Sequence, residues 1–321
     1  MKAILLESYS NDYDCLQLRD VAEPSIGARD VLVEVHAAGF NPFDCKLRKG
    51  WLQRFYPFAM PHILGSDFAG KVIRKGAAVW EYAEGDAVYG LQETMRDGSY
   101  AEYMAINANC LRRMPANLSF LDAASLPMVY ETAWMGLHDQ ALLRPGERVL
   151  VQAGAGGVGS AAVQLARVLG ASVAATCRAE AFDFVRSLGA NVLVDYRAQS
   201  FAKLLQEFDI VFDPIGGQVN LDSYQVLRRG GRMVVVLRED KLEIENSARL
   251  CAERGVTRHV VAFEQRADVL DYIRPLFEQG LLRPVVSKVL PLADAAAAHR
   301  ASDAGGARGK IVLQVRTDSA G

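Results

Sequence analysis

A glycine-rich segment between a predicted strand and a predicted helix constrains the fold more than any other feature of this sequence. The run 148–152 is apolar and β-branched, and the chain continues through Gly154-x-Gly156-x-x-Gly159 into a helical pattern over 157–169. In such a segment the first glycine allows a tight turn, the second lets another molecule approach the backbone, and the third lets helix and strand pack closely. The segment therefore predicts the start of a βαβ unit.

The chain after residue 144 repeats this alternation of strand and helix. The expected order is strand 148–152, helix 157–169, strand 172–176, helix 180–188, strand 191–194, helix 200–206, strand 209–212, helix 217–228, strand 231–237, a strand from Arg258 and a helix over 266–279. Strands that alternate with helices of about ten residues imply right-handed crossovers and a parallel sheet. The predicted fold class is therefore α/β, with a doubly wound parallel sheet.

Three sections of the 321-residue chain differ in pattern, and we expect two domains of ordinary size rather than one large domain. Residues 1–122 are β-rich, residues 123–265 carry the strand and helix alternation, and residues 266–321 return to β character after a helix, so they rejoin the first domain. The alanine-rich run 293–301 predicts a further helix. An apolar stripe predicts a helix that runs from Leu121 across the first boundary, and its members are Ala123, Leu126, Val129, Ala133 and Leu137.

The composition excludes several classes of function. Half of the residues are apolar, which suits a globular protein with a sizeable core, and the formal net charge of −2 offers no field for nucleic acid or anionic membranes. No signal peptide is visible, and the apolar runs fall far short of the roughly 20 residues that span a bilayer, so we expect a cytoplasmic protein. The five cysteines lie far apart without a C-x-x-C pair, which predicts buried thiols rather than disulfides or a cysteine-rich zinc lobe.

The glycine-rich segment is interpreted as a dinucleotide-binding turn. Exposed N–H groups and the helix dipole favour anions at the start of the helix, so the pyrophosphate of a dinucleotide would bind there without a lysine. The alternative is a glycine-rich turn without a ligand. The candidate cofactor-binding residues are Gly154, Ala155, Gly156, Gly157, Val158 and Gly159.

The end of the next strand favours NADPH as the cofactor. NAD enzymes of this fold place an Asp or Glu about 20 residues further on, where it holds the ribose 2′-OH. Here the strand ends in Cys177 and Arg178, and an arginine can pair with a 2′-phosphate through charge-assisted hydrogen bonds. The alternative is that Arg178 is a solvated residue at a helix start, and nearby Glu180 counts against NADPH.

Four short motifs occur in a recognisable order along the chain. They are Ala37-AGFNPFDCKLRKG, Leu64-GSDFAGKV, Gly85-DAVYG and Gly154-AGGVG. With these motifs the sequence resembles the medium-chain dehydrogenase/reductase superfamily, and more narrowly its quinone oxidoreductase branch that includes zeta-crystallin. The resemblance covers essentially the whole chain. It implies a GroES-like β-barrel catalytic domain formed from both chain ends, a Rossmann domain inserted between them, and a homodimer formed through the edges of the Rossmann sheets.

The zinc ligands of the superfamily's alcohol dehydrogenases are not matched. Asp44 follows the Asn41-Pro turn, the turn equivalent to Gly-His-Glu reads Gly65-Ser66-Asp67, and neither His36 nor His62 is in the expected frame. The closely spaced cysteines of a structural zinc lobe are also missing. We therefore expect no metal. Alcohol oxidation would lose its Lewis acid, whereas reduction of an electrophilic acceptor does not need one.

The resemblance also implies roles for residues around the cofactor. Asn41 and Thr132 match residues that reach the nicotinamide end, although Asn41 is equally a turn-former before proline. Tyr196 matches a tyrosine beside the adenosine phosphate, where it would be a partner of Arg178. The remaining candidates are Gly216 and Gly217 at a chain crossover, Leu237 at the end of the next strand, and Lys310, for which cofactor contact and strand start stay open.

The candidate catalytic residues are Tyr56, Lys46, Asn41 and Asp44. Hydride transfer is the chemistry of the cofactor, so the protein must align the acceptor and polarise its oxygen. Tyr56 aligns with an active-site tyrosine of the quinone reductases, and otherwise is a loop aromatic that caps the barrel. Lys46 is either a cationic donor or a solvated charge. Asp44 either orients Lys46 or replaces the absent ligand structurally.

The leading functional hypothesis is NADPH-dependent, zinc-free reduction of a quinone. The first alternative is reduction of an α,β-unsaturated aldehyde, ketone or acyl thioester on the same scaffold, and the fold cannot separate these two reactions. The second alternative is a non-enzymatic NADPH-binding protein, because crystallin-like members can be structural proteins or bind RNA. The expected partner is a small quinone or enone, and the acidic net charge argues against RNA.

Overall fold

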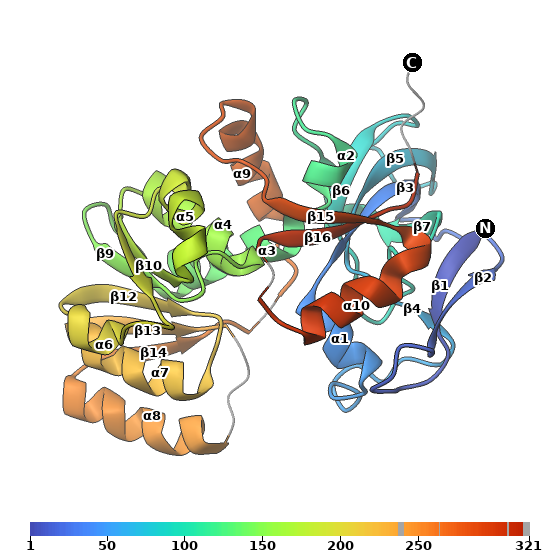
Figure 1. Ribbon diagram of the computed structural model, residues 1–321. Coiled ribbons are helices and arrows are strands. Elements are labelled where there is room, and N and C mark those ends of the chain that lie inside the picture. The colour runs from blue at the N-terminus through green and yellow to red at the C-terminus, as the bar shows by residue number, and fades with distance from the viewer. Residues whose placement is uncertain (237–240, 263, 307, 317–321) are drawn as a thin grey trace. The chain divides into compact units, whose positions relative to one another are not determined.

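The chain forms two units in the computed structural model, which describes residues 1–236, 241–262, 264–306 and 308–316 (Figure 1). Unit 1 comprises Met1–Met128 and Gln265–Gly321, and unit 2 comprises Val129–Glu264. The first boundary lies a few residues beyond the position suggested by the sequence pattern. The reason is that helix α2 (Phe120–Ala123) packs against strands of unit 1.

Six strands in the described part of unit 2 form one parallel sheet in the order β11-β10-β9-β12-β13-β14. The strands are β9 (Arg148–Val151), β10 (Ser172–Cys177), β11 (Val192–Asp195), β12 (Phe208–Asp213), β13 (Leu227–Val235) and β14 (Thr257–Val260). This is the doubly wound order. Successive strands are added outward from β9 on one side and outward from β12 on the other, so the strand order reverses between these two parallel neighbours. The predicted α/β class is confirmed, and the glycine-rich segment lies at the point where ligands bind in such sheets.

The helices of unit 2 cover both faces of this sheet. They are α4 (Gly157–Val168), α5 (Phe182–Leu188), α6 (Phe201–Leu204), α7 (Gly217–Ser223) and α8 (Lys241–Arg254). Figure 1 shows α4 and α5 on one side of the sheet and α7 and α8 on the other. Helix α4 follows from its sequence, because its residues 159–166 are small or apolar apart from Ser160 and Gln164 and all of them are buried.

The predicted helix over 217–228 is too long. Helix α7 ends at Ser223, a 3₁₀ turn covers Tyr224–Val226, and β13 begins at Leu227. The sequence pattern misplaces this boundary because Gly230 and Gly231 read as a loop before the strand. In the structure Gly230 has φ +78° and lies inside β13, where the register against β12 shifts between Phe208 and Ile210. Glycine with positive φ is the usual way to build such a bulge.

The single helix predicted from Leu121 is also divided. Helix α2 ends at Ala123, α3 covers Pro127–Trp134, and a π-helical segment continues over Met135–Gln140. Pro127 explains the break, because proline donates no backbone hydrogen bond and is favoured at the first position of a helix. The predicted apolar stripe is nevertheless buried, and its members are Ala123, Leu126, Val129, Ala133 and Leu137.

Unit 1 contains a large mixed sheet and a small antiparallel one. The large sheet has the order β15-β16-β3-β5-β6-β8, with β7 paired to β3. Its strands are β3 (Asp30–Phe40), β5 (Asp67–Lys75), β6 (Ala87–Leu91), β7 (Tyr103–Asn107), β8 (Leu111–Arg113), β15 (Val286–Pro291) and β16 (Lys310–Gln314). The small sheet contains β1 (Lys2–Leu6), β2 (Leu16–Asp20) and β4 (His62–Ile63). Besides α2, the described part of this unit contains the helices α1 (Pro42–Arg48), α9 (Ala267–Glu278) and α10 (Ala295–Asp303).

Strand β3 organises unit 1, because it pairs with β5, β7 and β16. Its inward-facing residues Val31, Val33 and Val35 are fully buried in one apolar core. The antiparallel pairing of β16 with β3 joins the C-terminal segment to the sheet of unit 1. This pairing also brings the start of β16 beside the end of β3, where the chain enters α1.

Two further observations concern the chain as a whole. The five cysteines are free, and four of them are buried, as predicted. Among the described residues, no helix is long and apolar enough to cross a membrane.

Candidate active site

The Asn41 side chain lies at the junction of β3 and α1 and is almost completely buried, with 3% of its surface exposed. Its amide nitrogen donates to Asp67 Oδ2 at 2.9 Å, and its amide oxygen accepts from Lys310 Nζ at 2.6 Å. The backbone N–H of Asn41 donates to Asp44 Oδ2 at 2.8 Å. Asn41 therefore does more than form a turn before Pro42, because both ends of its amide are held by charged groups.

Lys310 is a buried lysine at the first position of β16, with 5% of its surface exposed. Its ammonium group donates to Phe40 O at 2.8 Å, Asn41 Oδ1 at 2.6 Å and Asp67 Oδ2 at 2.8 Å. An ammonium group has three donors, so all of them are used within unit 1. The sequence left two roles open for Lys310, cofactor contact and strand start. Lys310 does start β16, and its side chain also belongs to a buried polar cluster.

Asp67 completes this cluster from the start of β5. Its Oδ2 accepts from Asn41 and Lys310, and its Oδ1 accepts from the backbone N–H of Met128 at 2.8 Å. The side chain is fully buried, and the ion pair with Lys310 compensates for the loss of solvent. Asp67 was not among the candidates from sequence, although its place in the Gly65-Ser66-Asp67 turn was a signal.

Asp44 has a different environment on the first turn of α1. Its Oδ2 accepts from Asn41 N–H and from the Tyr100 hydroxyl at 2.9 Å, while Oδ1 has no hydrogen-bond partner among the described residues. Burial raises the pKa of the Asp44 carboxyl from 3.8 to about 7, and the Asp67 charge adds to this, whereas the two hydrogen bonds and the Lys310 charge lower it. Within the described residues no hydrogen bond joins Asp44 to Lys46. The structure thus favours a structural role for Asp44 over one that orients Lys46.

Lys46 lies in the last turn of α1, and Tyr56 lies in the loop that follows this helix. Both side chains are half-buried. Burial lowers the pKa of the Lys46 ammonium group. The Tyr56 ring packs edge-on against Phe43 of α1, with 5.6 Å between the ring centroids. Of the two candidate donors, Lys46 is thus part of α1 and Tyr56 packs against this helix. Asn41 immediately precedes the helix.

The residues at the expected metal position do not fit a zinc site. Asp67 is already paired with the Lys310 ammonium group, whose positive charge opposes a dication there. His62 interacts with Asp97, and His36 interacts with Glu34. No group of three or more potential ligands of the types His, Cys, Asp and Glu occurs among the described residues.

The glycine-rich turn of unit 2 joins β9 to α4 and has space at its second glycine. A Cβ atom on Gly154 would lie 2.7 Å from Ala175 Cβ, and one on Gly159 would collide with the carbonyl oxygen of Ala153. A Cβ on Gly156 would meet no atom closer than 3.3 Å. The third glycine thus serves close packing, as predicted, and the second leaves room beside the backbone. The first, for which a tight turn was predicted, also packs closely, against Ala175. Ala155, Gly156, Gly157 and Val158 are half-exposed.

A network of buried polar side chains holds the start of this turn through hydrogen bonds. Thr176 Oγ1 donates to Gln152 Oε1 at 2.6 Å and accepts from the Ala153 N–H at 3.1 Å, and Gln152 Nε2 donates to Ser223 Oγ at 3.0 Å. Ala153 has φ +52°, a conformation that costs energy for a non-glycine residue and needs such support. Sequence reasoning missed Gln152, which follows β9, and Thr176 in β10, because single buried polar residues carry no motif.

Arg178 and Tyr196 follow the ends of the adjacent strands β10 and β11, which are paired at Cys177 and Asp195. The Arg178 Nε donates to the Tyr196 hydroxyl at 3.0 Å, and this hydrogen bond raises the pKa of the guanidinium group. Both side chains are accessible, and Tyr196 is 50% exposed. The structure therefore brings together the two residues that the sequence assigned to the adenosine phosphate.

Two further candidates, Gly216 and Gly217, lie in the turn after β12. Gly216 and Gly217 have φ +83° and +60°, and the Asp213 carboxylate binds the backbone N–H groups of Ile215 and Gly216. Asp213 is buried, which raises the pKa of its carboxyl. Sequence reasoning did not select Asp213. Thr132 is 5% exposed on α3. Leu237 lies outside the described residues.

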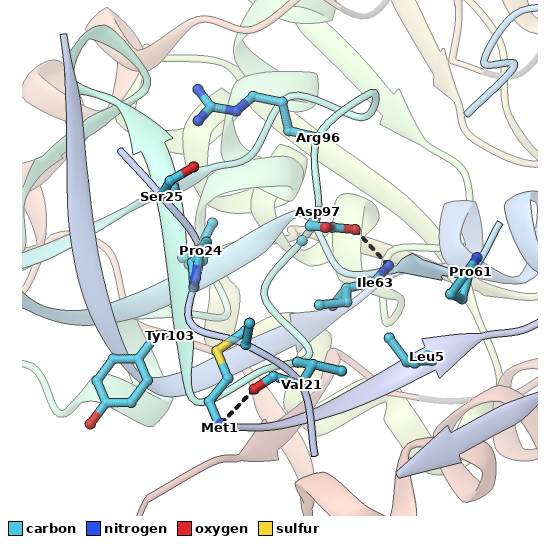
Figure 2. A pocket seen from close by; sticks show the side chains of 14 residues that line it. Met1, Leu5, Val21, Pro24, Ser25, Pro61, Ile63, Arg96, Asp97 and Tyr103 are labelled. Atoms are coloured by element: carbon cyan, nitrogen blue, oxygen red, sulfur yellow. Dashed lines mark hydrogen bonds between the residues drawn. The ribbon is translucent and has the colours of Figure 1, made fainter. Parts of the chain in front are cut away.

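A hollow of about 520 Å³ occurs elsewhere in unit 1 (Figure 2). It is lined mainly by apolar residues, and none of the candidate residues line it. Three polar groups at its edge are engaged: Arg96 binds Asp30, Asp97 accepts from the Ile63 N–H, and the Met1 amine donates to Val21 O. The candidate residues therefore lie elsewhere, in the Asn41 region of unit 1 and in the glycine-rich turn of unit 2.

Comparison with known proteins decides the family. The model of the alcohol dehydrogenase GroES-like domain matches residues 27–116, and that of the zinc-binding dehydrogenase family matches residues 188–313. The NADPH-dependent alkenal/one oxidoreductase of Arabidopsis thaliana is 35% identical over 98% of this chain and 79% of its own. The human quinone oxidoreductase is 30% identical over 94% of both chains. The chain belongs to the medium-chain dehydrogenase/reductase superfamily.

A solved structure of this superfamily agrees with the fold. The quinone oxidoreductase from Coxiella burnetii has a TM-score of 0.89 and 31% identity, and the match covers 98% of this chain and 99% of that one. The resemblance to the quinone oxidoreductase branch is therefore confirmed. The name of the zinc-binding family model does not decide the metal, because the described residues contain no group of three or more potential ligands of the types His, Cys, Asp and Glu.

The environment of Asp44 predicts a specific pH dependence of stability. The folded carboxyl, with its pKa near 7, binds more protons than the unfolded one between pH 4 and 7, so its contribution to stability falls as pH rises through this window. Asp44→Asn removes the titration and keeps an oxygen acceptor. The measured quantity is the midpoint of thermal unfolding of the variant minus that of wild type. We expect this difference to be at least about 2 °C more positive at pH 8 than at pH 5.

The matched control is Asp14→Asn, which alters an exposed carboxylate in the same unit. Its difference from wild type should stay constant between the two pH values. A constant difference for Asp44→Asn as well would show that Asp44 does not titrate in this range.

Proposed function

We propose that this oxidoreductase uses NADPH to deliver hydride to a quinone, without a metal. The chain is an enzyme of an oxidoreductase family with a nicotinamide cofactor. The observation that carries the proposal is the half-exposed glycine-rich turn at the reversal point of the sheet, with Arg178 and Tyr196 at the ends of the neighbouring strands. When bound, the cofactor supplies the hydride, and the protein supplies position and polarity.

The choice of NADPH rests on the charge at the end of β10. Arg178 presents an exposed guanidinium group that Tyr196 orients through a hydrogen bond to Nε, which leaves its terminal N–H groups for a 2′-phosphate. The backbone N–H groups at the start of α4 would hold the pyrophosphate, because this end of the helix is the positive end of its dipole and favours anions. Thr132 and Asn41 are proposed for the nicotinamide end.

The proposed acceptor is one that is already electrophilic. A quinone gains negative charge on oxygen as hydride arrives, so it needs a hydrogen-bond donor rather than a Lewis acid. Tyr56 is the proposed donor, because a phenol can donate to this oxygen. Lys46 is the second candidate, and its partial burial would strengthen its interaction with a developing charge.

One comparison favours a second candidate function. The Arabidopsis relative is named for alkenal and enone reduction, and it is more similar to this chain than the human quinone oxidoreductase is. Reduction of an α,β-unsaturated carbonyl would use the same cofactor and the same donor to the carbonyl oxygen. Homodimerisation and a cytoplasmic location remain predictions, as does the alternative of a protein that binds NADPH without turnover.

The deciding experiment measures NADPH and NADH oxidation by metal-stripped protein. We expect turnover of 9,10-phenanthrenequinone or 1,4-benzoquinone with NADPH and at least tenfold lower kcat/KM with NADH. Turnover of acrolein or another enone without turnover of quinone would promote the second candidate. Tight binding of NADPH with no turnover of any acceptor, or activity that appears when zinc is added, would contradict the proposal.

Substitution of Arg178 tests the choice of cofactor. Loss of a charge-assisted contact to phosphate is worth about 1.5–3 kcal/mol, so Arg178→Met should raise the dissociation constant of NADPH by about 10- to 100-fold. The constant for NADH should change less than twofold, because NADH carries no 2′-phosphate. Binding is measured by the fluorescence of the reduced nicotinamide.

Arg197→Met is the control, because Arg197 is an exposed arginine next to Tyr196. It removes the same charge from the segment after the adjacent strand β11 but leaves the Arg178 hydrogen bond to Tyr196 in place. Equal weakening by both substitutions would mean that general electrostatics, and not a specific contact, favours NADPH.

Substitution of Tyr56 tests the proposed donor. One donor to a developing oxyanion contributes about 3 kcal/mol, so Tyr56→Phe should lower kcat by about 100-fold and leave the dissociation constant of NADPH within twofold. Tyr103→Phe, which removes a phenol from β7, should leave both quantities unchanged. If Lys46→Met lowers kcat and Tyr56→Phe does not, Lys46 is the donor, and if neither does, both assignments are wrong.

A further inference from the structure

The Asn41 amide is held between a donor that cannot accept and an acceptor that cannot donate. Lys310 Nζ carries only hydrogen-bond donors, and the ionised Asp67 carboxylate carries only acceptors. Lys310 contacts the amide oxygen at 2.6 Å, and Asp67 Oδ2 contacts the amide nitrogen at 2.9 Å. A rotation of the amide by 180° would place nitrogen against ammonium and oxygen against carboxylate. The two charges therefore select one orientation of Asn41.

Further hydrogen bonds to the backbone hold both charged groups in place. Lys310 also donates to Phe40 O, and Asp67 also accepts from the Met128 N–H. The ammonium and carboxylate contact each other at 2.8 Å and are almost or fully buried. Because each charged group has a further backbone contact, neither can follow a rotation of the Asn41 amide without losing hydrogen bonds in a dry environment.

Stability alone does not explain this ion pair. Desolvation of two charges costs about as much as their attraction returns, and apolar residues of similar volume often serve stability equally well. What the pair provides, and an apolar pair cannot, is a fixed direction for the amide between them. The Asn41 amide uses one N–H and one lone pair in these contacts and keeps one N–H.

We propose that Lys310 and Asp67 are positioning residues that fix the Asn41 amide so that its remaining N–H donates to the nicotinamide end of the cofactor. This inference rests on the proposed function, because it takes Asn41 to be a cofactor contact. With 3% of Asn41 exposed, only a small part of the side chain can reach a ligand. A flipped amide would present an oxygen where the N–H is needed, so the orientation decides whether the contact forms.

The test separates positioning from charge balance by a cycle of variants. Lys310→Met leaves the Asp67 carboxylate buried without its cation and should lower the midpoint of thermal unfolding. The double variant Lys310→Met with Asp67→Asn contains no buried charge at these positions, so the midpoint should recover most of the loss. The dissociation constant of NADPH should nevertheless be raised about tenfold in the double variant, and kcat/KM for the acceptor should fall with it.

The same changes are then made in an Asn41→Leu background, which has no amide to orient. Asn41→Leu alone should raise the dissociation constant of NADPH about tenfold, and adding the double substitution should change it less than twofold, because interacting residues are not additive. Arg96→Met, which removes the cation of the Asp30 ion pair in the same unit, is the control. It should lower the unfolding midpoint without a change in NADPH binding.

Two results would overturn the inference. Recovery of NADPH binding together with the unfolding midpoint in the double variant would mean that the pair only balances charge. Independent, multiplicative effects in the Asn41→Leu background would mean that Lys310 and Asp67 act elsewhere. Failure of the wild type to reduce quinone or enone would contradict the proposed function instead, and the cycle on NADPH binding would still decide the positioning role.

Discussion

The buried ammonium group of Lys310 is the interaction on which the site in unit 1 depends. Its three donors need three acceptors, and they are supplied by the end of β3, the first residue before α1 and the start of β5. These segments lie far from Lys310 in the sequence, and the pairing of β16 with β3 brings the lysine to them. A single side chain near the end of the chain thus fixes the geometry of residues near its start, which is why both chain ends are needed to build one site.

In unit 2, buried side chains meet the hydrogen-bonding needs of two turns. The chain reverses direction sharply after β9 and after β12, and the N–H groups in these turns must find acceptors. Thr176 accepts from the Ala153 N–H after β9, and the Asp213 carboxylate accepts from two N–H groups after β12. In each turn the supporting group is buried, which leaves the half-exposed backbone of Ala155, Gly156 and Gly157 available for a ligand. The rigid scaffold and the accessible surface are therefore provided by different residues.

The sequence predicts most of the fold because periodicity and glycine placement report local geometry. The glycine-rich turn, the alternation of strands and helices and the buried stripe from Ala123 to Leu137 follow from such patterns, whereas the boundary near Gly230 does not, since the same glycine signals a loop or a bulge. The site is harder to predict. Arg178 and Tyr196 could be paired through the family resemblance, but the contacts of Lys310 with Asn41 and Asp67 span more than 240 positions. No local pattern distinguishes a buried lysine at a strand start from an exposed one, and Asp44 could not be assigned without the position of Tyr100.

The chemistry of the Asn41 region is coherent with an acceptor that needs no Lewis acid. The carboxylate of Asp67 attracts a cation. In this chain that cation is the ammonium group of a side chain, Lys310, which lies beside it. A lysine ammonium group neutralises the carboxylate and donates hydrogen bonds, but it offers no open coordination position to an alkoxide. The remaining means of stabilising negative charge on an acceptor are hydrogen-bond donors, such as the phenol of Tyr56, and the fixed dipoles of oriented amides. A site built in this way suits acceptors whose own electronic structure accommodates the incoming hydride.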